Sequence, residues 1–284
     1  LEQLLAYKNR NVTALATGDP MWFGIGATLS HRVAEDEMRV LPAPSAFSLA
    51  AARMAWPLAD IECLSAHGRP IEALIPFITP DVKLLILTAN GDAPKDIAKL
   101  LTVRGFGESR FTVLGNLGAT DEQKIDSTAA EWGNKNAPDL NTVAVICVAG
   151  PNAKIFPRIG GLPDDAFIHD GQMTKREVRA VTLSALQPLP GQLLWDVGAG
   201  CGSIAIEWMR GARNAQAFAI EKSSKRRDMI QTNSLGLGTP SLEIIAGAAP
   251  DALVGLETPD ATFIGGGLTT SSVLPSCWKA LKSG

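Results

Sequence analysis

One short segment, LLWDVGAGCGSIAIEW (193–208), limits the folds open to this chain more than any other feature. An apolar, strand-like run ends at Asp196, and three glycines, Gly198, Gly200 and Gly202, precede a run with helical periodicity. Glycines there let the backbone approach a ligand closely, and a helix that starts after them offers free N–H groups and its positive dipole end. The segment therefore predicts a strand, a ligand-binding loop and a helix.

A carboxylate follows the next predicted strand, 215–220, at Glu221. A carboxylate in that place can accept both ribose hydroxyls of an adenosine. A tight turn without a ligand would explain the glycines of the loop but not this acid. A nicotinamide dinucleotide is the other alternative, but its fingerprint is GxGxxG, whereas this loop is GxGxG followed by Ser203. The sole tyrosine, Tyr7, excludes a tyrosine-based dehydrogenase site in this half.

Strands and helices alternate around this loop, which is typical of a parallel, doubly wound sheet. A helix is expected over 174–186, where Thr174 and Glu177 have the spacing of a capping box. The other expected elements are strands at 193–197, 215–220, 241–246 and 261–264, a helix from Ser203 and a helix over 223–235.

The first half also alternates apolar runs with helical stretches, so its fold class is α/β as well. The segment GPNAKIFPRIGGLP is rich in Gly and Pro and has the composition of a linker. We therefore expect two domains, 1–150 and 164–284, joined by a linker at 151–163. Expected in the first domain are strands at 12–16, 38–41, 82–88, 111–114 and 142–148 and helices at 23–33, 94–101 and from the N-cap Ser45 towards Trp56.

Composition excludes several classes of function. A net charge of −3 and a pI of about 5.7 argue against a nucleic-acid partner, because phosphate binding needs concentrated positive charge. No apolar run reaches the roughly 18 residues of a membrane span, and no signal peptide is expected. The four cysteines lie far apart in the sequence and form no cluster with the three histidines, so neither a metal site nor a disulfide framework is expected. We expect a soluble, cytoplasmic protein, and the ends at Leu1 and Gly284 indicate a fragment truncated at both ends.

The glycine loop with its ribose-binding acid resembles motif I of the class I S-adenosylmethionine (SAM) methyltransferases. Methylases of exocyclic base nitrogens carry an Asp/Asn-Pro-Pro-aromatic stretch after the strand that here ends at Ile264. This chain has Gly265, Gly266 and Gly267 there instead, which disfavours nucleic-acid methylation.

Longer segments resemble a single family. DAFIHDGQMTKREVR (165–179), GAAPDAL (247–253) and FIGGG (263–267) are similar to the decarboxylating precorrin methyltransferases of cobalamin biosynthesis. ATGDPMWFGIG (16–26) and PAPSAFSLAAARMAWPLADIECLSAHGR (42–69) resemble the tetrapyrrole methylase fold. Joined in this order, the halves resemble the precorrin-6Y C5,15-methyltransferases (decarboxylating). The resemblance implies an N-terminal tetrapyrrole methylase fold, truncated at its start, and a C-terminal Rossmann-like class I methyltransferase sheet, truncated at its end.

The family resemblance also implies a reaction and its site residues. The reaction is SAM-dependent C-methylation of precorrin-6Y at C5 and C15 with decarboxylation of an acetate side chain, giving precorrin-8 without a metal. Such methylases often self-associate, so we expect a homo-oligomer. The SAM contacts carried over by position are Thr174, Gly198, Ala199, Gly200, Cys201, Gly202, Glu221 and Ala248 in the C-terminal half and Gly18, Asp19, Ser45 and Ala46 in the N-terminal half.

The implied tetrapyrrole substrate bears many carboxylates, so cationic side chains are expected near it. The candidates are His67, Arg69, Lys175 and Arg176, each of which could equally be a solvated surface charge. No catalytic acid is predicted. Two other functions stay open, a methyltransferase for another small molecule and a SAM-binding protein without catalysis.

Overall fold

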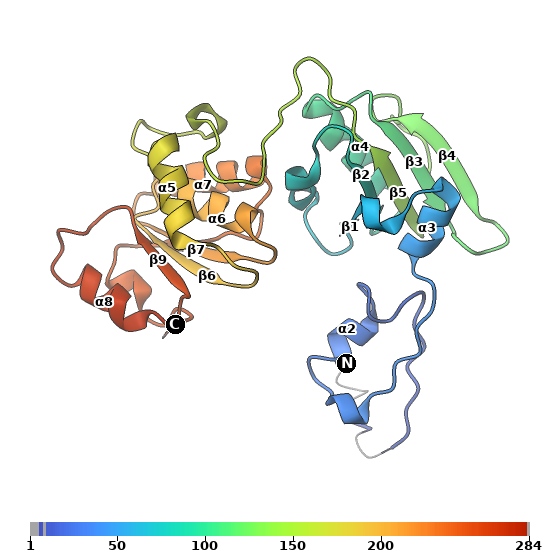
Figure 1. The fold of residues 1–284 in the computed structure, drawn as a ribbon, viewed down its shortest axis with the longest axis horizontal. Helices are drawn as coiled ribbons and strands as arrows, with labels where there is room; N and C mark the ends of the chain where they lie inside the picture. Colours follow the sequence, from blue (N-terminus) through green and yellow to red (C-terminus); the bar gives the residue numbers. More distant parts are fainter. Residues whose placement is uncertain (1–5, 8–9, 283–284) are drawn as a thin grey trace. The chain divides into compact units, whose positions relative to one another are not determined.

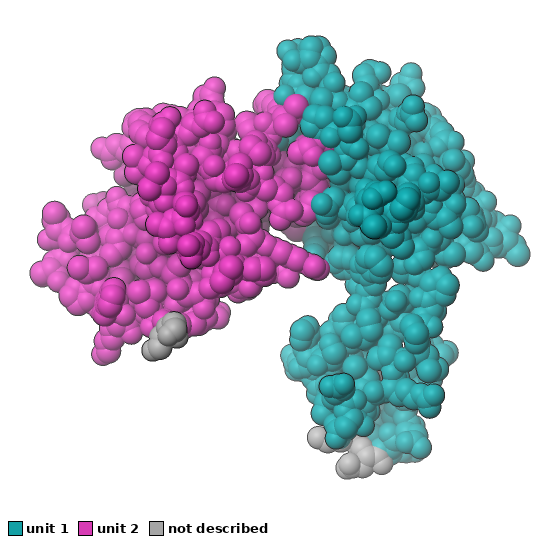
Figure 2. Space-filling view, in the orientation of Figure 1, with its two compact units in different colours: residues 1–69, 80–153 teal, residues 70–79, 154–284 magenta. Residues whose placement is uncertain are grey.

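The computed structural model describes residues 6–7 and 10–282, so the two chain ends from which we expect truncation lie outside it. The chain forms two compact units, each described by itself below (Figures 1 and 2). Unit 1 comprises Leu1–Arg69 and Pro80–Ala153, and unit 2 comprises Pro70–Thr79 and Lys154–Gly284. The short segment Pro70–Thr79 thus belongs to unit 2 although the predicted division places it in the first domain. None of the helices in the described ranges combines the length and the apolar character that crossing a bilayer demands.

Unit 1 is built on a mixed five-stranded sheet with the strand order β1-β2-β5-β3-β4 (Figure 1). Only β1 and β2 are parallel, and every other neighbouring pair is antiparallel. The strands are β1 (Ile61–Ser65), β2 (Lys83–Leu87), β3 (Arg110–Gly115), β4 (Gln123–Thr128) and β5 (Asn141–Ile146).

Helix α3 (Ala46–Met54) covers one face of this sheet. Its residues Phe47 and Ala50 are buried against Leu85 of β2 and Leu114 of β3. The predicted N-cap is confirmed, because the Ser45 hydroxyl accepts a hydrogen bond from the Ser48 N–H at 3.1 Å. The remaining α-helices described in unit 1 are α2 (Ile25–Leu29) and α4 (Ala93–Val103), and its 3-10 helices are η1 (Glu35–Glu37) and η2 (Leu58–Asp60).

Three expectations for unit 1 were wrong. The segments 12–16 and 38–41 are not strands, since neither pairs with another strand among the described residues and strand geometry is stabilised by such pairing. The predicted helix 23–33 shrinks to Ile25–Leu29, because Phe23 has a φ of +57°, a left-handed backbone that cannot continue a helix. Strand β1 was missed because Glu62 interrupts its apolar residues, and strand β4 because Ile125 is its one apolar residue.

Unit 2 contains a four-stranded sheet in the order β8-β7-β6-β9, and every pairing in it is parallel. This confirms the predicted doubly wound sheet. The chain runs outward from β6 through β7 to β8 and then returns to the other side of β6 at β9. The strand order therefore reverses between β6 and β9. The strands are β6 (Leu193–Val197), β7 (Gln216–Glu221), β8 (Glu243–Ala246) and β9 (Ala261–Ile264).

Helices cover both faces of this sheet (Figure 1). Successive side chains of β6 point to opposite faces of the sheet. Leu194 packs in the core under α6, whereas Leu193 and Trp195 pack in the core under α8. Helix α8 was not predicted, because proline usually breaks a helix. Pro275 lies near the start of α8, and the first turn of a helix tolerates proline. The helices are α5 (Arg176–Leu186), α6 (Ser203–Gly211), α7 (Ser224–Leu237) and α8 (Val273–Ala280), with the 3-10 turns η3 (Ile71–Phe77), η4 (Asp164–Ala166) and η5 (Asp251–Leu253).

The predicted capping box at the start of α5 was wrong. The N-cap is Lys175, not Thr174, and no side chain caps this helix. The carbonyl oxygen of Thr174 instead accepts a hydrogen bond from Nη1 of Arg179 at 2.5 Å. Because Lys175 has an extended backbone, with a ψ of 155°, the helical hydrogen bonds begin with the one from the Arg179 N–H to the Lys175 oxygen.

Candidate functional site

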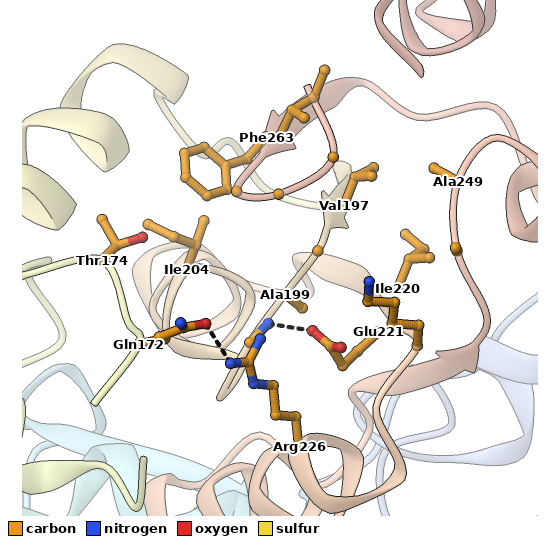
Figure 3. Close-up of a pocket in the computed structure, with 18 of the residues that line it drawn as sticks. Gln172, Thr174, Val197, Ala199, Ile204, Ile220, Glu221, Arg226, Ala249 and Phe263 are labelled. Atoms are coloured by element: carbon orange, nitrogen blue, oxygen red, sulfur yellow. Dashed lines mark hydrogen bonds between the residues drawn. The ribbon is translucent and has the colours of Figure 1, made fainter. Parts of the chain in front are cut away.

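A cavity of about 730 Å³ opens at the carboxyl ends of the parallel strands of unit 2 (Figure 3). It is lined by Val197 at the end of β6, by Ile220 and Glu221 at the end of β7, and by Ile264 at the end of β9. The cavity therefore spans the point where the strand order reverses. In open α/β sheets, ligands bind in the crevice outside the carboxyl ends of the strands at such a point.

The glycine loop forms one wall of this cavity. Gly198, Gly200 and Gly202 have φ angles of +72°, +62° and +82°, a region that disfavours residues with a Cβ. An ideal Cβ on Gly198 would lie 2.7 Å from the backbone nitrogen of Gly266. Backbone therefore meets backbone between the loops after β6 and β9, and a side chain would not fit.

Glu221 lines the cavity beside the glycine loop and is 3% exposed. Its Oε2 accepts a hydrogen bond from the Gly200 N–H at 2.9 Å (Figure 3). Its Oε1 accepts one from the Ser223 N–H at 2.9 Å. A carboxylate oxygen can accept more than one hydrogen bond, so both oxygens keep capacity for ligand hydroxyls. The carboxylate is thus fixed in place by the loop it faces.

Asp196 lies behind the loop rather than in the cavity wall. Its Oδ2 accepts a hydrogen bond from the Ala205 N–H at 3.1 Å, which caps the start of α6, while Oδ1 has no hydrogen-bond partner among the described residues. Burial, reinforced by the negative charge of Glu221, raises the pKa of Asp196 to about 7. This carboxyl group therefore supports the loop and titrates near neutral pH.

A segment that we call the strap, residues 168–174, forms the opposite wall. Gln172, Met173 and Thr174 of the strap line the cavity. Arg226 of α7 also lines it and donates from Nη2 to the Gln172 side chain (Figure 3). Its Nε donates to Oδ2 of Asp170 at 2.9 Å. The hydrogen bond from Arg226 lowers the pKa of the Asp170 carboxyl. A cation thus joins the strap to α7 at the edge of the cavity.

The end of the strap is held by a buried ion pair. Arg179 of α5, which is fully buried, donates from Nε to Oε1 of Glu207 of α6 at 2.6 Å and also holds the Thr174 carbonyl. Glu207 in turn accepts hydrogen bonds from the N–H groups of Gly161 and Leu162. Sequence reasoning missed this pair, although a lone acid inside the apolar run SIAIEWM was a usable signal.

The structure brings six of the eight residues predicted for the C-terminal SAM site to the cavity. Cys201 and Gly202 belong to the same loop but do not line the cavity, and Gly202 packs against Ile230. Burial raises the pKa of the Cys201 thiol, so this cysteine is not activated as a nucleophile. The six at the cavity are Thr174, Gly198, Ala199, Gly200, Glu221 and Ala248.

The lining also includes residues that the sequence did not single out. Most belong to the strap, to the cationic start of α7 or to the loops after β8 and β9. They are Gln172, Met173, Val178, Val197, Ser203, Ile204, Ile220, Lys222, Arg226, Gly247, Ala249, Phe263, Ile264, Gly265, Gly266, Gly267, Thr270 and Val273.

Lys175 and Arg176, two of the substrate candidates, are exposed and do not line this cavity. The Lys175 Nζ lies 3.8 Å from Oδ2 of Asp164, and Nε of Arg176 donates to the Gly161 carbonyl at 2.9 Å. Both cations therefore contact the segment that precedes α5, and a role towards substrate stays a prediction.

The predicted site residues of unit 1 are also brought together. An ideal Cβ on Gly18, whose φ is +66°, would lie 3.7 Å from the Ser45 Cα and 3.8 Å from the Ala46 nitrogen. The GDP turn and the start of α3 are thus adjacent. Oδ1 of Asp19 accepts a hydrogen bond from the Met21 N–H at 2.8 Å, within the turn itself.

The two other substrate candidates, both in unit 1, differ in their surroundings. The Arg69 guanidinium lies over the Phe23 ring, 5.4 Å from its centroid, and so reaches the segment that follows the GDP turn. His67 has its Nδ1 3.4 Å from the Thr88 carbonyl oxygen. Of these two, Arg69 is the one that contacts the segment following the GDP turn.

Comparison with known proteins identifies the family. Residues 1–132 match the model of the tetrapyrrole (corrin/porphyrin) methylases, and residues 165–284 match that of the precorrin methyltransferase domain. The precorrin-6Y C(5,15)-methyltransferase [decarboxylating] of Sinorhizobium sp. is 46% identical over 282 residues, which cover 99% of this chain and 68% of that protein. The chain belongs to the family of decarboxylating precorrin-6Y C5,15-methyltransferases.

A second member of this precorrin-6Y methyltransferase family, from Mycobacterium tuberculosis (strain ATCC 25618 / H37Rv), is 38% identical over 283 residues, which cover 99% of this chain and 70% of that protein. A solved structure of the C-terminal domain of the Rhodobacter capsulatus precorrin-6Y C5,15-methyltransferase is 41% identical, with a TM-score of 0.42, and covers 45% of this chain and 68% of that chain. Within this family member, the cavity is lined by residues of the matched precorrin methyltransferase domain, and the GDP turn lies in the matched tetrapyrrole methylase region.

Proposed function

We propose that this protein methylates precorrin-6Y at C5 and C15, with SAM as the methyl donor, and decarboxylates an acetate side chain to give precorrin-8. The family to which the chain belongs supports the substrate. The observation that carries the cofactor is the cavity at the strand reversal, where three left-handed glycines face the carboxylate of Glu221. No metal is part of the proposal.

The residues of the cavity fit SAM by their chemistry. Gly198 and Gly200 would bring backbone against the cofactor, since their left-handed φ angles leave the wall without side chains. Glu221 would accept the ribose hydroxyls, and Ala248, beyond the end of β8, would lie against the adenine. When bound, SAM supplies a methyl group on a sulfonium, which is a good leaving group.

The task left to the side chains is alignment rather than strong acid–base chemistry. A reduced tetrapyrrole is an extended enamine whose bridge carbons are already nucleophilic, so holding carbon, methyl and sulfur in line supplies most of the rate enhancement. Apolar residues at the cavity, among them Val178, Phe263 and Ile264, would exclude water from that line. The conjugated ring can accept the electron pair released as carbon dioxide leaves.

We also propose the roles that fall outside this cavity. Residues 1–150 form a tetrapyrrole methylase domain, 151–163 a linker and 164–284 the decarboxylating methyltransferase domain. Gly18, Asp19, Ser45 and Ala46 contact a second SAM, which the adjacency of the GDP turn and α3 supports. His67, Arg69, Lys175 and Arg176 contact substrate carboxylates. The protein works in the cytoplasm as a homo-oligomer.

The test is mass spectrometry of precorrin-6Y incubated with SAM and the protein. The expected product has gained two methyl groups and lost one carbon dioxide. An unchanged mass, with SAM binding demonstrated in the same sample, would contradict the proposed substrate while leaving the SAM site in place. Absence of SAM binding would contradict the cofactor assignment itself.

A further inference from the structure

The two walls of the cavity are tied together by one buried side chain that does not itself line it. Asn233 of α7 is 3% exposed. Its Nδ2 donates to the carbonyl oxygens of Cys201 at 3.0 Å and Ile168 at 2.9 Å, and its Oδ1 accepts from the Ile168 N–H at 2.8 Å. Two acceptors face the nitrogen and one donor faces the oxygen, so only this orientation of the amide satisfies all three partners.

The partners of Asn233 belong to the two segments that would hold the cofactor. Ile168 begins the strap, and Cys201 lies inside the glycine loop. The same two segments meet again at the cavity, where an ideal Cβ on Gly200 would lie 3.6 Å from the Gln172 carbonyl oxygen. The Asn233 amide therefore fixes the spacing between the two walls from behind.

Arg226 provides a second attachment of the strap to the same helix. Arg226 and Asn233 are seven residues apart, which places them on one face of α7. Arg226 binds Asp170 and Gln172 but lines the cavity, so a variant of it could change ligand contacts directly. Asn233 has no such contact and isolates the effect of wall spacing.

We propose that Asn233 is a positioning residue for the cofactor, acting through the glycine loop and the strap; this inference rests on the proposed SAM site. Asn233→Asp keeps the shape of the side chain but removes both N–H donors and turns a carboxylate towards two carbonyl oxygens. With two hydrogen bonds lost at the walls, the SAM affinity of the folded protein falls about tenfold or more. The KM for SAM rises accordingly, while the KM for the tetrapyrrole stays unchanged.

The experiment is isothermal titration of the full chain with SAM, well below the thermal unfolding midpoint of each variant. Thr232→Ala is the matched control, because Thr232 is exposed on the same helix and its hydroxyl bonds only to the Asp228 carbonyl in the described contacts. The part of the SAM-binding signal that is lost in Gly198→Val is the part that belongs to this cavity. The expected result is weak binding in Asn233→Asp and unchanged binding in Thr232→Ala.

Folded Asn233→Asp with the wild-type Kd would overturn the inference and leave the SAM site standing. If the wild type and Gly198→Val instead give the same SAM-binding signal, the cavity does not bind SAM and the proposed SAM site itself is overturned. If Asn233→Asp does not fold, Asn233→Ser replaces it, since serine adds no charge and keeps one hydroxyl. Hydrogen exchange of the Ile168 amide, measured without any ligand, then reports whether the strap has been released, and unaltered exchange counts against the proposal.

Discussion

Gly198 is the residue at which the loops after β6 and β9 touch, and its substitution gives the most direct test of the cavity. An alanine there would adopt a φ of +72° and place its Cβ 2.7 Å from the Gly266 nitrogen. We expect Gly198→Ala to lose SAM binding and to destabilise the fold. Gly191→Ala is the control, because Gly191 has a φ of +78° and nothing within 4 Å of the added Cβ.

The control should cost only the strain of a left-handed alanine, about 1–2 kcal/mol of unfolding free energy. Calorimetric titration with SAM and urea denaturation of both variants provide the comparison. Equal stability and equal affinity in the two variants would show that the contact between Gly198 and Gly266 has no consequence.

Asp196 should give the stability of the protein a distinctive pH dependence. Its pKa is raised from 3.8 to about 7 in the folded state, chiefly by burial, so folding takes up a proton in this range. The contribution of this group to stability therefore falls as pH rises from about 4 to about 7 and is constant above. Asn at this position does not titrate. The free energy of unfolding of Asp196→Asn, measured relative to that of the wild type, should therefore be higher at pH 8 than at pH 4.5.

Urea denaturation of both proteins between pH 4.5 and 8 measures the difference directly. Subtracting the two curves removes the other carboxylates, such as Asp170, whose pKa is lowered and whose effect has the opposite sign. A difference that does not change with pH would mean that Asp196 titrates outside this window.

At the scale of elements, the buried pair of Arg179 and Glu207 joins α5, α6 and the segment that precedes α5. Arg179 is fully buried and Glu207 is 2% exposed, so removing the Glu207 charge leaves Arg179 with only the partly exposed carboxylate of Asp164 as its ion-pair partner. We expect Glu207→Gln to lower the free energy of unfolding by about 3–5 kcal/mol. Lys282→Ala, which breaks the partly exposed pair with Asp260, should cost less than about 1 kcal/mol.

Urea denaturation again provides the measurement. The two substitutions each remove one ion pair from unit 2. The ratio of the two losses of unfolding free energy therefore reports the effect of burial. Similar losses for both would argue that the Arg179–Glu207 pair is not shielded from solvent in solution.

At the scale of the whole molecule, two separate units each carry a predicted SAM site. The full chain should therefore bind two SAM molecules, and Gly198→Val should reduce this to one, because Gly18, Asp19, Ser45 and Ala46 belong to the other unit. Titration calorimetry gives both stoichiometries. A stoichiometry of one in the wild type, abolished by Gly198→Val, would contradict the second site and leave the first.

Sequence alone determined the features whose signal is local. The bounds of β6 and β9 agree with prediction because apolar runs between turn residues specify short buried strands, and the glycine loop with Glu221 follows from residue types at strand ends. The Ser45 cap is equally local, since donor and acceptor lie three residues apart. These features need no knowledge of distant partners.

Only the tertiary structure decided which distant residues complete the cavity. The strap meets α7 through pairs such as Ile168 with Asn233 and Asp170 with Arg226, separated by more than fifty positions in the chain. No periodicity predicts such a pairing, because each partner alone is an ordinary residue on a loop or helix. Its role arises only when the fold places a donor opposite an acceptor.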